Sequence, residues 1–165
     1  MIKRCPQVEI DSILTVINDA AQAYKGVIPQ ALWHDSYMGR DELSNEIRSG
    51  VQFWGYYGNR SLLGVMGIQD KQDVTLIRHA YVRTSDRRSG VGTKLLKWLE
   101  KRSKKPILIG TWADAKWAID FYKKNGYTLI KAEERGMLLE KYWSVLPSQA
   151  EASVVLADPK WIRSA

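Results

Sequence analysis

The sequence has little cysteine and no long hydrophobic run. Cys5 is the only cysteine among 165 residues, which excludes an intrachain disulfide and is typical of a reducing compartment. Nowhere do about 18 consecutive apolar residues occur, and residues 1–6 do not begin an apolar stretch of signal-peptide length. We therefore expect a cytoplasmic protein with no membrane partner.

Metal-binding patterns and domain boundaries are also scarce. The two histidines, His34 and His79, lie far apart in the sequence and make a poor ligand set, so no metal is expected. No internal repeat, low-complexity stretch or linker divides the chain. Its length fits a single domain over residues 1–165, with the motif-bearing core at about 51–157.

The net charge of +7 is compatible with nucleic acid, an acidic membrane or a phosphate-rich small ligand as partner. Basic residues concentrate at 83–88 and at 94–105. The second group alternates with apolar residues on a predicted helix, which is typical of a solvated helix face. The first group lies in a glycine-containing turn. No recognised nucleic-acid-binding pattern occurs, and we expect no nucleic-acid partner.

Hydrophobic periodicity and turn residues predict the order of helices and strands. The predicted helices cover about 7–24, 41–48, 91–102, 115–125 and 132–143. The predicted strands cover 51–57, 61–69, 74–83, 107–111, 127–130 and 153–157. Helices come first, a run of strands follows, and strands then alternate with helices. This order indicates an α/β domain with a mixed sheet rather than a regular doubly wound one.

One passage has the pattern of an anion site. The strand ending at 79–83 leads through a polar loop to 87–93, where Gly90 and Gly92 precede a strong helix. The first N–H groups of a helix have no intrahelical partner, and glycines let a phosphate approach the backbone closely. A plain strand-to-helix turn explains the glycines equally well. The third glycine of a Rossmann fingerprint and the lysine of a P-loop are both absent.

Residues 87–92 resemble the (Gln/Arg)-x-x-Gly-x-(Gly/Ala) signature of the GNAT N-acetyltransferase superfamily, here preceded by the pair Tyr81-Val82. Residues 118–127 are similar to that family's Ala-x-x-Phe-Tyr-x-x-x-Gly-Phe block. The resemblance implies the acyl-CoA N-acyltransferase fold, a twisted and mostly antiparallel central sheet flanked by helices. Ala115 stands where the family often has an asparagine that touches pantetheine. The link at 132–147 is long for the family, and we expect an inserted helix that Pro147 ends.

The resemblance also implies an activity and a cosubstrate site. Such enzymes transfer acetyl from acetyl-CoA to a primary amine of a small molecule or protein N-terminus, by direct attack in a ternary complex. Backbone amides of Arg88 to Thr93 would hold the pyrophosphate, the edge of the strand would pair with pantetheine, and the Val82 N–H would polarise the thioester carbonyl. The implied acetyl-CoA site comprises Ala80, Tyr81, Val82, Arg87, Arg88, Ser89, Gly90, Val91, Gly92 and Thr93.

Two residues are candidates for moving protons. Tyr122 matches the family tyrosine that protonates the departing thiolate, although an aromatic core residue would fit the same helix face. His79 is expected on the same strand face as Ile77 and Tyr81. Its imidazole suits a general base, but a hydrogen-bonded core histidine is an alternative.

A water chain is a further alternative for the general base, and Asp73 or Glu46 would then anchor it. The acceptor pocket is expected to use some of the seven tryptophans and eight tyrosines. We predict that its walls include Tyr24, Trp33, Trp54 and Trp112, with Tyr37 nearby.

Two other functions fit parts of the sequence. A non-catalytic acyl-CoA sensor would keep the pyrophosphate loop without needing Tyr122, and a basic nucleic-acid-binding module would explain the charge. The identity of the amine stays open. The last predicted strand, 153–157, is a candidate interface for a homodimer.

Overall fold

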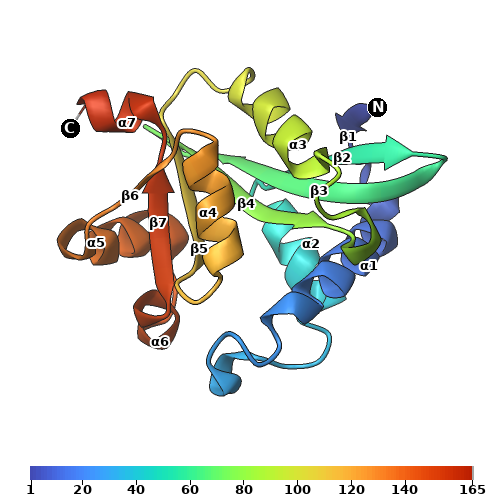
Figure 1. Ribbon diagram of the computed structural model, residues 1–165, viewed down its shortest axis with the longest axis horizontal. Helices are drawn as coiled ribbons and strands as arrows, with labels where there is room; N and C mark the ends of the chain where they lie inside the picture. The colour runs from blue at the N-terminus through green and yellow to red at the C-terminus, as the bar shows by residue number, and fades with distance from the viewer. Residues whose placement is uncertain (165) are drawn as a thin grey trace.

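The computed structural model describes residues 1–164 and contains one seven-stranded sheet of order β1-β2-β3-β4-β5-β7-β6 (Figure 1). Its strands are β1 (Ile2–Arg4), β2 (Gln52–Gly58), β3 (Ser61–Asp70), β4 (Thr75–Val82), β5 (Ile107–Trp112), β6 (Thr128–Leu129) and β7 (Ser153–Ala157). Only β4 and β5 pair in parallel; the other neighbours are antiparallel. The predicted mixed, mostly antiparallel sheet is confirmed.

Seven α-helices accompany the sheet in residues 1–164, and every helix predicted from periodicity is present. They are α1 (Ile10–Ala21), α2 (Arg40–Arg48), α3 (Val91–Glu100), α4 (Lys116–Lys124), α5 (Ala132–Trp143), α6 (Pro147–Glu151) and α7 (Pro159–Ser164). The inserted helix is α5, but Pro147 begins α6 rather than ending α5, because Ser144 already leaves the helix with a φ of +51°. No helix in the described part of the chain is long and apolar enough to cross a membrane.

The helices cover the two faces of the sheet in separate layers (Figure 1). Helices α3 and α4 pack on one face, whereas α1, α2 and α5 pack on the other. Successive strand residues alternate between these layers: Ile77 of β4 joins the core beneath α3, and Leu76 joins the core beside α5. Hydrophobic burial therefore fixes which side chains face which helix layer.

Strands β4 and β5 separate part-way along their length. Their parallel ladder runs from Thr75 and Ile107 to Ile77 and Ile109 and then stops. Beyond that point β4 remains paired with β3, while β5 remains paired with β7 out to Trp112. The two halves of the sheet thus diverge and leave unpaired strand edges facing each other.

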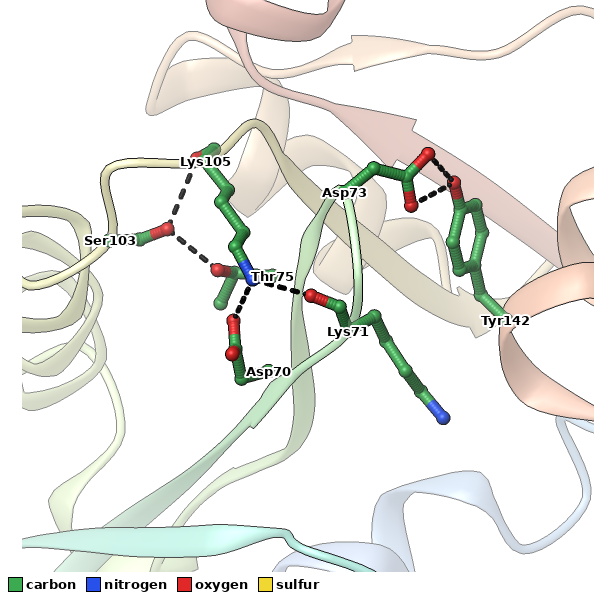
Figure 2. Close-up of polar contacts among 7 residues, drawn as sticks. All are labelled: Asp70, Lys71, Asp73, Thr75, Ser103, Lys105 and Tyr142. Atoms are coloured by element: carbon green, nitrogen blue, oxygen red, sulfur yellow. Dashed lines mark hydrogen bonds and ion pairs between the residues drawn. The ribbon is translucent and has the colours of Figure 1, made fainter.

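Polar contacts hold the opposite end of these strands together (Figure 2). Ser103 Oγ donates to Thr75 Oγ1 at 2.7 Å, and Lys105 Nζ lies 2.7 Å from Asp70 Oδ1. The Tyr142 hydroxyl of α5 donates to the Asp73 carboxylate at 2.8 Å. The paired end is therefore fixed to its neighbours.

Strand β7 lies inside the sheet, with β5 on one side and β6 on the other. Leu156 and Ala157 pair with residues of both neighbours. These two residues therefore have no free edge for pairing with a second copy of the chain, and the homodimer interface at residues 153–157 stays a prediction.

Candidate active site

The start of α3 exposes backbone donors. Gly90 is the N-cap residue with a φ of +84°, a left-handed conformation that glycine adopts without strain. No side chain caps the helix, and the Lys94 N–H is the one that donates to the Gly90 carbonyl, at 3.0 Å. The preceding amides of Val91, Gly92 and Thr93 therefore have no acceptor within the helix. This end of α3 has the chemistry of an anion site.

The loop before α3 is anchored to neighbouring elements. Arg87 Nη2 donates to the Ala20 carbonyl of α1 at 2.9 Å, and the Thr84 N–H donates to Asp19 Oδ2 at 2.7 Å. The Arg87 side chain, expected beside a phosphate, is thus turned toward α1. Arg88 is exposed on the loop.

The amide of Val82 faces the gap between β4 and β5. Arg83 N–H donates to the Leu63 carbonyl of β3 at 2.8 Å, and hydrogen-bonded and non-hydrogen-bonded pairs alternate along an antiparallel ladder. Val82, paired with Gly64, is therefore a non-hydrogen-bonded residue whose N–H and carbonyl point away from β3. The unpaired edge of β4 presents this donor toward the separated β5.

A cavity of about 170 Å³ lies where the two strands separate. Its walls include residues 78–81 of β4, residues 110–112 of β5, Tyr24, Tyr37, Tyr122 of α4 and Trp143 just at the end of α5. Because α4 and α5 cover opposite faces of the sheet, the cavity connects both faces through the gap.

Tyr122 is both a core residue and a cavity residue. Its side chain packs edge-on against Phe121 and Tyr127, and the residue is only 5% exposed. Burial raises the pKa of its phenol well above the usual range, so it stays protonated at neutral pH. No group within residues 1–164 hydrogen bonds to its hydroxyl, which leaves the proton available to a ligand in the cavity.

His79 sits on a β-bulge in β4. Residues Arg78 and Tyr81 pair with Gly67 and Val65, so β4 carries one residue more than β3 here. His79 has a φ of +53°, a left-handed conformation that costs a non-glycine residue on the order of 1–3 kcal/mol. The chain holds a histidine where bulges often use glycine.

The bulge also corrects one prediction about side-chain direction. Ile77 joins the core beneath α3, but His79 lies 5.9 Å from the Phe53 ring and Tyr81 lies 6.2 Å from the Tyr24 ring, both on the opposite face. The expected common face for Ile77, His79 and Tyr81 is wrong because the extra residue breaks the period of two.

The predicted aromatic wall is assembled in part. Tyr24 and Tyr37 have ring centroids 5.4 Å apart, Trp33 stacks on Tyr37 at 5.9 Å, and Trp112 Nε1 donates to the Tyr37 hydroxyl at 2.8 Å. Trp54 is not part of this wall. It packs instead beside α3, where its ring lies 6.0 Å from Trp98 and 4.8 Å from the Arg102 guanidinium.

Sequence reasoning missed Trp143 and Gly110 as site residues. A Cβ placed on Gly110 would lie only 3.1 Å from the Trp143 indole, so this glycine makes room for the ring. Nothing in the sequence links a residue of the inserted helix to a glycine in β5. Ala115, which replaces the expected asparagine, is fully buried against Ala21 and Tyr24.

Within residues 1–164 no three histidine, cysteine, aspartate or glutamate side chains cluster closely enough to hold a metal ion.

Comparison with known proteins gives one family and many structures of similar fold. The family model described as Acetyltransferase (GNAT) domain matches residues 18–138. The PaiA N-acetyltransferase of Thermoplasma acidophilum, solved in complex with coenzyme A, superposes with a TM-score of 0.72 at 16% identity, covering 96% of this chain and 97% of that one. A search of curated proteins by sequence finds no significant match.

Two further solved structures of similar fold are named for acetyl acceptors of different kinds. The ribosomal-protein-S18-alanine N-acetyltransferase of Escherichia coli has a TM-score of 0.69 at 16% identity, covering 97% of this chain and 93% of that one. The aminoglycoside 6'-acetyltransferase type Ii has a TM-score of 0.66 at 19% identity, covering 96% of both chains. At such sequence identities, the likeness to solved structures shows the fold alone. The family model, however, matches most of the chain. This protein therefore belongs to the GNAT acetyltransferase family and is an acyltransferase.

Proposed function

We propose that the protein transfers an acetyl group from acetyl-CoA to a primary amine in a ternary complex, in the cytoplasm. The observation that carries the proposal is the cavity at the separation of β4 and β5. It is open to an unpaired strand edge, contains the protonated Tyr122, and has the aromatic rings of Tyr24, Tyr37, Trp112 and Trp143 in its walls.

The residues present fit a coenzyme A moiety. The uncapped amides of Val91, Gly92 and Thr93 suit the pyrophosphate, with Gly90 keeping the approach open, since a Cβ there would meet nothing within 4 Å. The backbone edge of Ala80 to Val82 suits the amide groups of pantetheine. When bound, acetyl-CoA supplies an activated acetyl thioester.

Each group in the cavity then has a task. The Val82 N–H would stabilise the negative charge that develops on the acetyl oxygen. His79 would take the proton that the attacking ammonium group must lose, and Tyr122 would give its proton to the departing sulfur. Holding both reactants in one cavity lowers the barrier by up to about 7–11 kcal/mol in ideal cases.

The acceptor would enter from the face covered by α1, α2 and α5. Tyr24, Tyr37 and Trp112 provide aromatic faces that attract an amine. Both a small amine and a protein N-terminus fit this description, and the two similar structures above are named for one acceptor of each kind. A neutral tyrosine at the strand gap favours catalysis over a non-catalytic acyl-CoA sensor, which would need Tyr122 only as a core residue.

Calorimetric titration with acetyl-CoA tests the cosubstrate site. We expect micromolar binding by the wild-type protein and loss of binding in Gly92→Glu, whose new side chain starts beside Phe121 and the helix end. Gly136→Glu adds the same charge on the exposed surface of α5 and is the matched control. A folded wild-type protein that does not bind acetyl-CoA would rule out the proposal.

Thiol release then tests catalysis. A polyamine, an aminoglycoside, an aromatic monoamine and a peptide with a free N-terminus form the panel of acceptors. Tyr122→Phe is expected to bind acetyl-CoA normally and to lower kcat by about 100-fold. Binding without thiol release for every amine, by both proteins, would favour the sensor instead.

A further inference from the structure

Glu46 of α2 reaches the strained histidine of β4. Its Oε2 lies 3.0 Å from His79 Nε2 and 3.3 Å from Arg78 Nη1. The side chains are largely withdrawn from solvent, with 15% of His79 and 22% of Glu46 exposed. The hydrogen bond from His79 is the main cause that lowers the pKa of the Glu46 carboxyl below its usual range, so Glu46 is ionised at neutral pH.

An ionised carboxylate determines which ring nitrogen carries the proton. A carboxylate only accepts hydrogen bonds, so Nε2 must be the protonated nitrogen of a neutral His79 ring. Nδ1 is then unprotonated, and it has no hydrogen-bond partner within residues 1–164. His79 lines the cavity at the strand gap, so its unprotonated Nδ1 is well placed to accept a proton from an amine bound there.

We propose that Glu46 is a positioning residue that holds His79 as the Nε2-protonated tautomer, ready to accept a proton at Nδ1 from the acceptor amine. This inference rests on the proposed function and adds a residue from α2 to it. The positive φ of His79 supports it, because the fold keeps the histidine at a position that strains the backbone.

The proton and bond changes balance without a further reactant. The ammonium group of the acceptor loses a proton to His79 Nδ1, its nitrogen bonds to the acetyl carbon, and the carbon–sulfur bond breaks. Tyr122 protonates the sulfur and regains a proton from solvent. The imidazolium ion formed on His79 is stabilised by Glu46 until the proton leaves to water. The attacking nitrogen then loses a second proton directly to solvent, so neither His79 nor Tyr122 has to accept it.

Three charged groups surround the contact between His79 and Glu46. Glu46 faces His79 from α2 and Arg78 adjoins it on β4, while Lys71 acts on Glu46 from the turn between β3 and β4. Phe53 of β2 covers the ring without charge. Replacing Glu46 by glutamine removes the only negative charge among these groups. The glutamine amide can present either its oxygen or its nitrogen to Nε2, so it no longer fixes the tautomer of His79.

Nuclear magnetic resonance of the ring nitrogens tests the tautomer without any amine. The chain has two histidines, so a His34→Gln variant assigns the spectrum. We expect the Nε2-protonated tautomer for His79 in the wild-type protein and a mixture of the two neutral tautomers in Glu46→Gln, whose side-chain amide can both donate and accept. A wild-type ring protonated at Nδ1 would overturn the proposal.

Kinetics separate positioning from a merely structural contact. With acetyl-CoA and the amine selected by thiol release, Glu46→Gln should lower kcat about tenfold and leave KM for acetyl-CoA unchanged. Asp41→Asn, the same chemical change on the exposed start of α2, should match the wild-type protein.

Outcomes distinguish this inference from the proposed function. A kcat that stays at the wild-type value in Glu46→Gln while the tautomer of His79 changes would overturn the role of His79 and Glu46 and leave the acetyltransferase proposal intact. A wild-type protein that neither binds acetyl-CoA nor releases thiol would overturn both. Thermal unfolding and acetyl-CoA titration of Glu46→Gln confirm that a kinetic loss is not a loss of folding.

Discussion

Ile77 and Ile109 form the last pair of the parallel ladder between β4 and β5. Both side chains are buried in the core beneath α3 and α4, so the pair is held firmly. Two residues later, at His79, β4 enters its bulge, whereas β5 continues along β7. The gap that follows is therefore a consequence of two well-packed halves of the sheet, rather than of a flexible edge.

The unpaired amide of Val82 leads to a first prediction. Val82→Pro removes this N–H but no ladder hydrogen bond, since the amide points away from β3. We expect a folded protein with kcat lowered by about 100-fold or more, the cost of losing one oxyanion donor. Val82→Ala keeps the amide and should retain most of the activity. Equal activity of the proline and alanine variants would show that the amide has no catalytic part.

Burial of Tyr122 predicts a change in stability at high pH. Burial raises the pKa of Tyr122, whereas the same phenol in the unfolded chain ionises near pH 10. Its contribution to stability is therefore complete below pH 10 and declines as the pH rises toward the folded value, by up to about 1.4 kcal/mol per pH unit. Urea unfolding between about pH 9 and 11 should show a shallower decline for Tyr122→Phe. Parallel curves for the two proteins would contradict this.

The fold was largely predictable because its signals are local. The spacing of Ile13, Ile17 and Ala20 marks α1, and the glycine after Asn125 ends α4, so periodicity and turn residues were enough for the main elements. The short β1 was not predicted. It exists because Ile2 and Arg4 pair with β2, which is a contact between distant parts of the chain.

The site was predictable only where its residues are neighbours in sequence. The loop before α3 and the position of Tyr122 follow from contiguous motifs. The bulge at His79, its contact with Glu46, and the Trp143 ring on Gly110 depend on how separate segments meet. Trp54 was wrongly grouped with the acceptor wall for the same reason: an aromatic residue on a strand has two faces to choose from, and this one packs beside Trp98.

The hydrogen bond by which Arg87 anchors the loop before α3 predicts how the affinity for acetyl-CoA depends on salt concentration. Arg87→Met removes its hydrogen bond to the Ala20 carbonyl and should weaken acetyl-CoA binding by about 1 kcal/mol, or roughly fivefold, because the loop loosens. The loss should be similar at low and high salt. Arg88→Met, at the exposed neighbour, should lose affinity mainly at low salt, as expected of a charge near phosphate. Titration of both variants with acetyl-CoA at two ionic strengths tests this prediction. A loss of affinity in Arg87→Met that depends strongly on salt would indicate that the Arg87 side chain contacts the phosphate instead.

The contact between Gly110 and Trp143 makes the inserted helix part of the acceptor pocket. Gly110→Val adds atoms that would meet the indole at about the 3.1 Å separation expected for a Cβ, so the ring must move. We expect KM for the amine to rise by roughly 5- to 30-fold, corresponding to about 1–2 kcal/mol of overpacking, with little change in the affinity for acetyl-CoA. The double variant with Trp143→Ala relieves the clash, and its KM should not exceed that of Trp143→Ala alone. If the two effects were instead simply additive, the valine would be acting on the strand itself, and Trp143 would not be the group through which position 110 shapes the pocket.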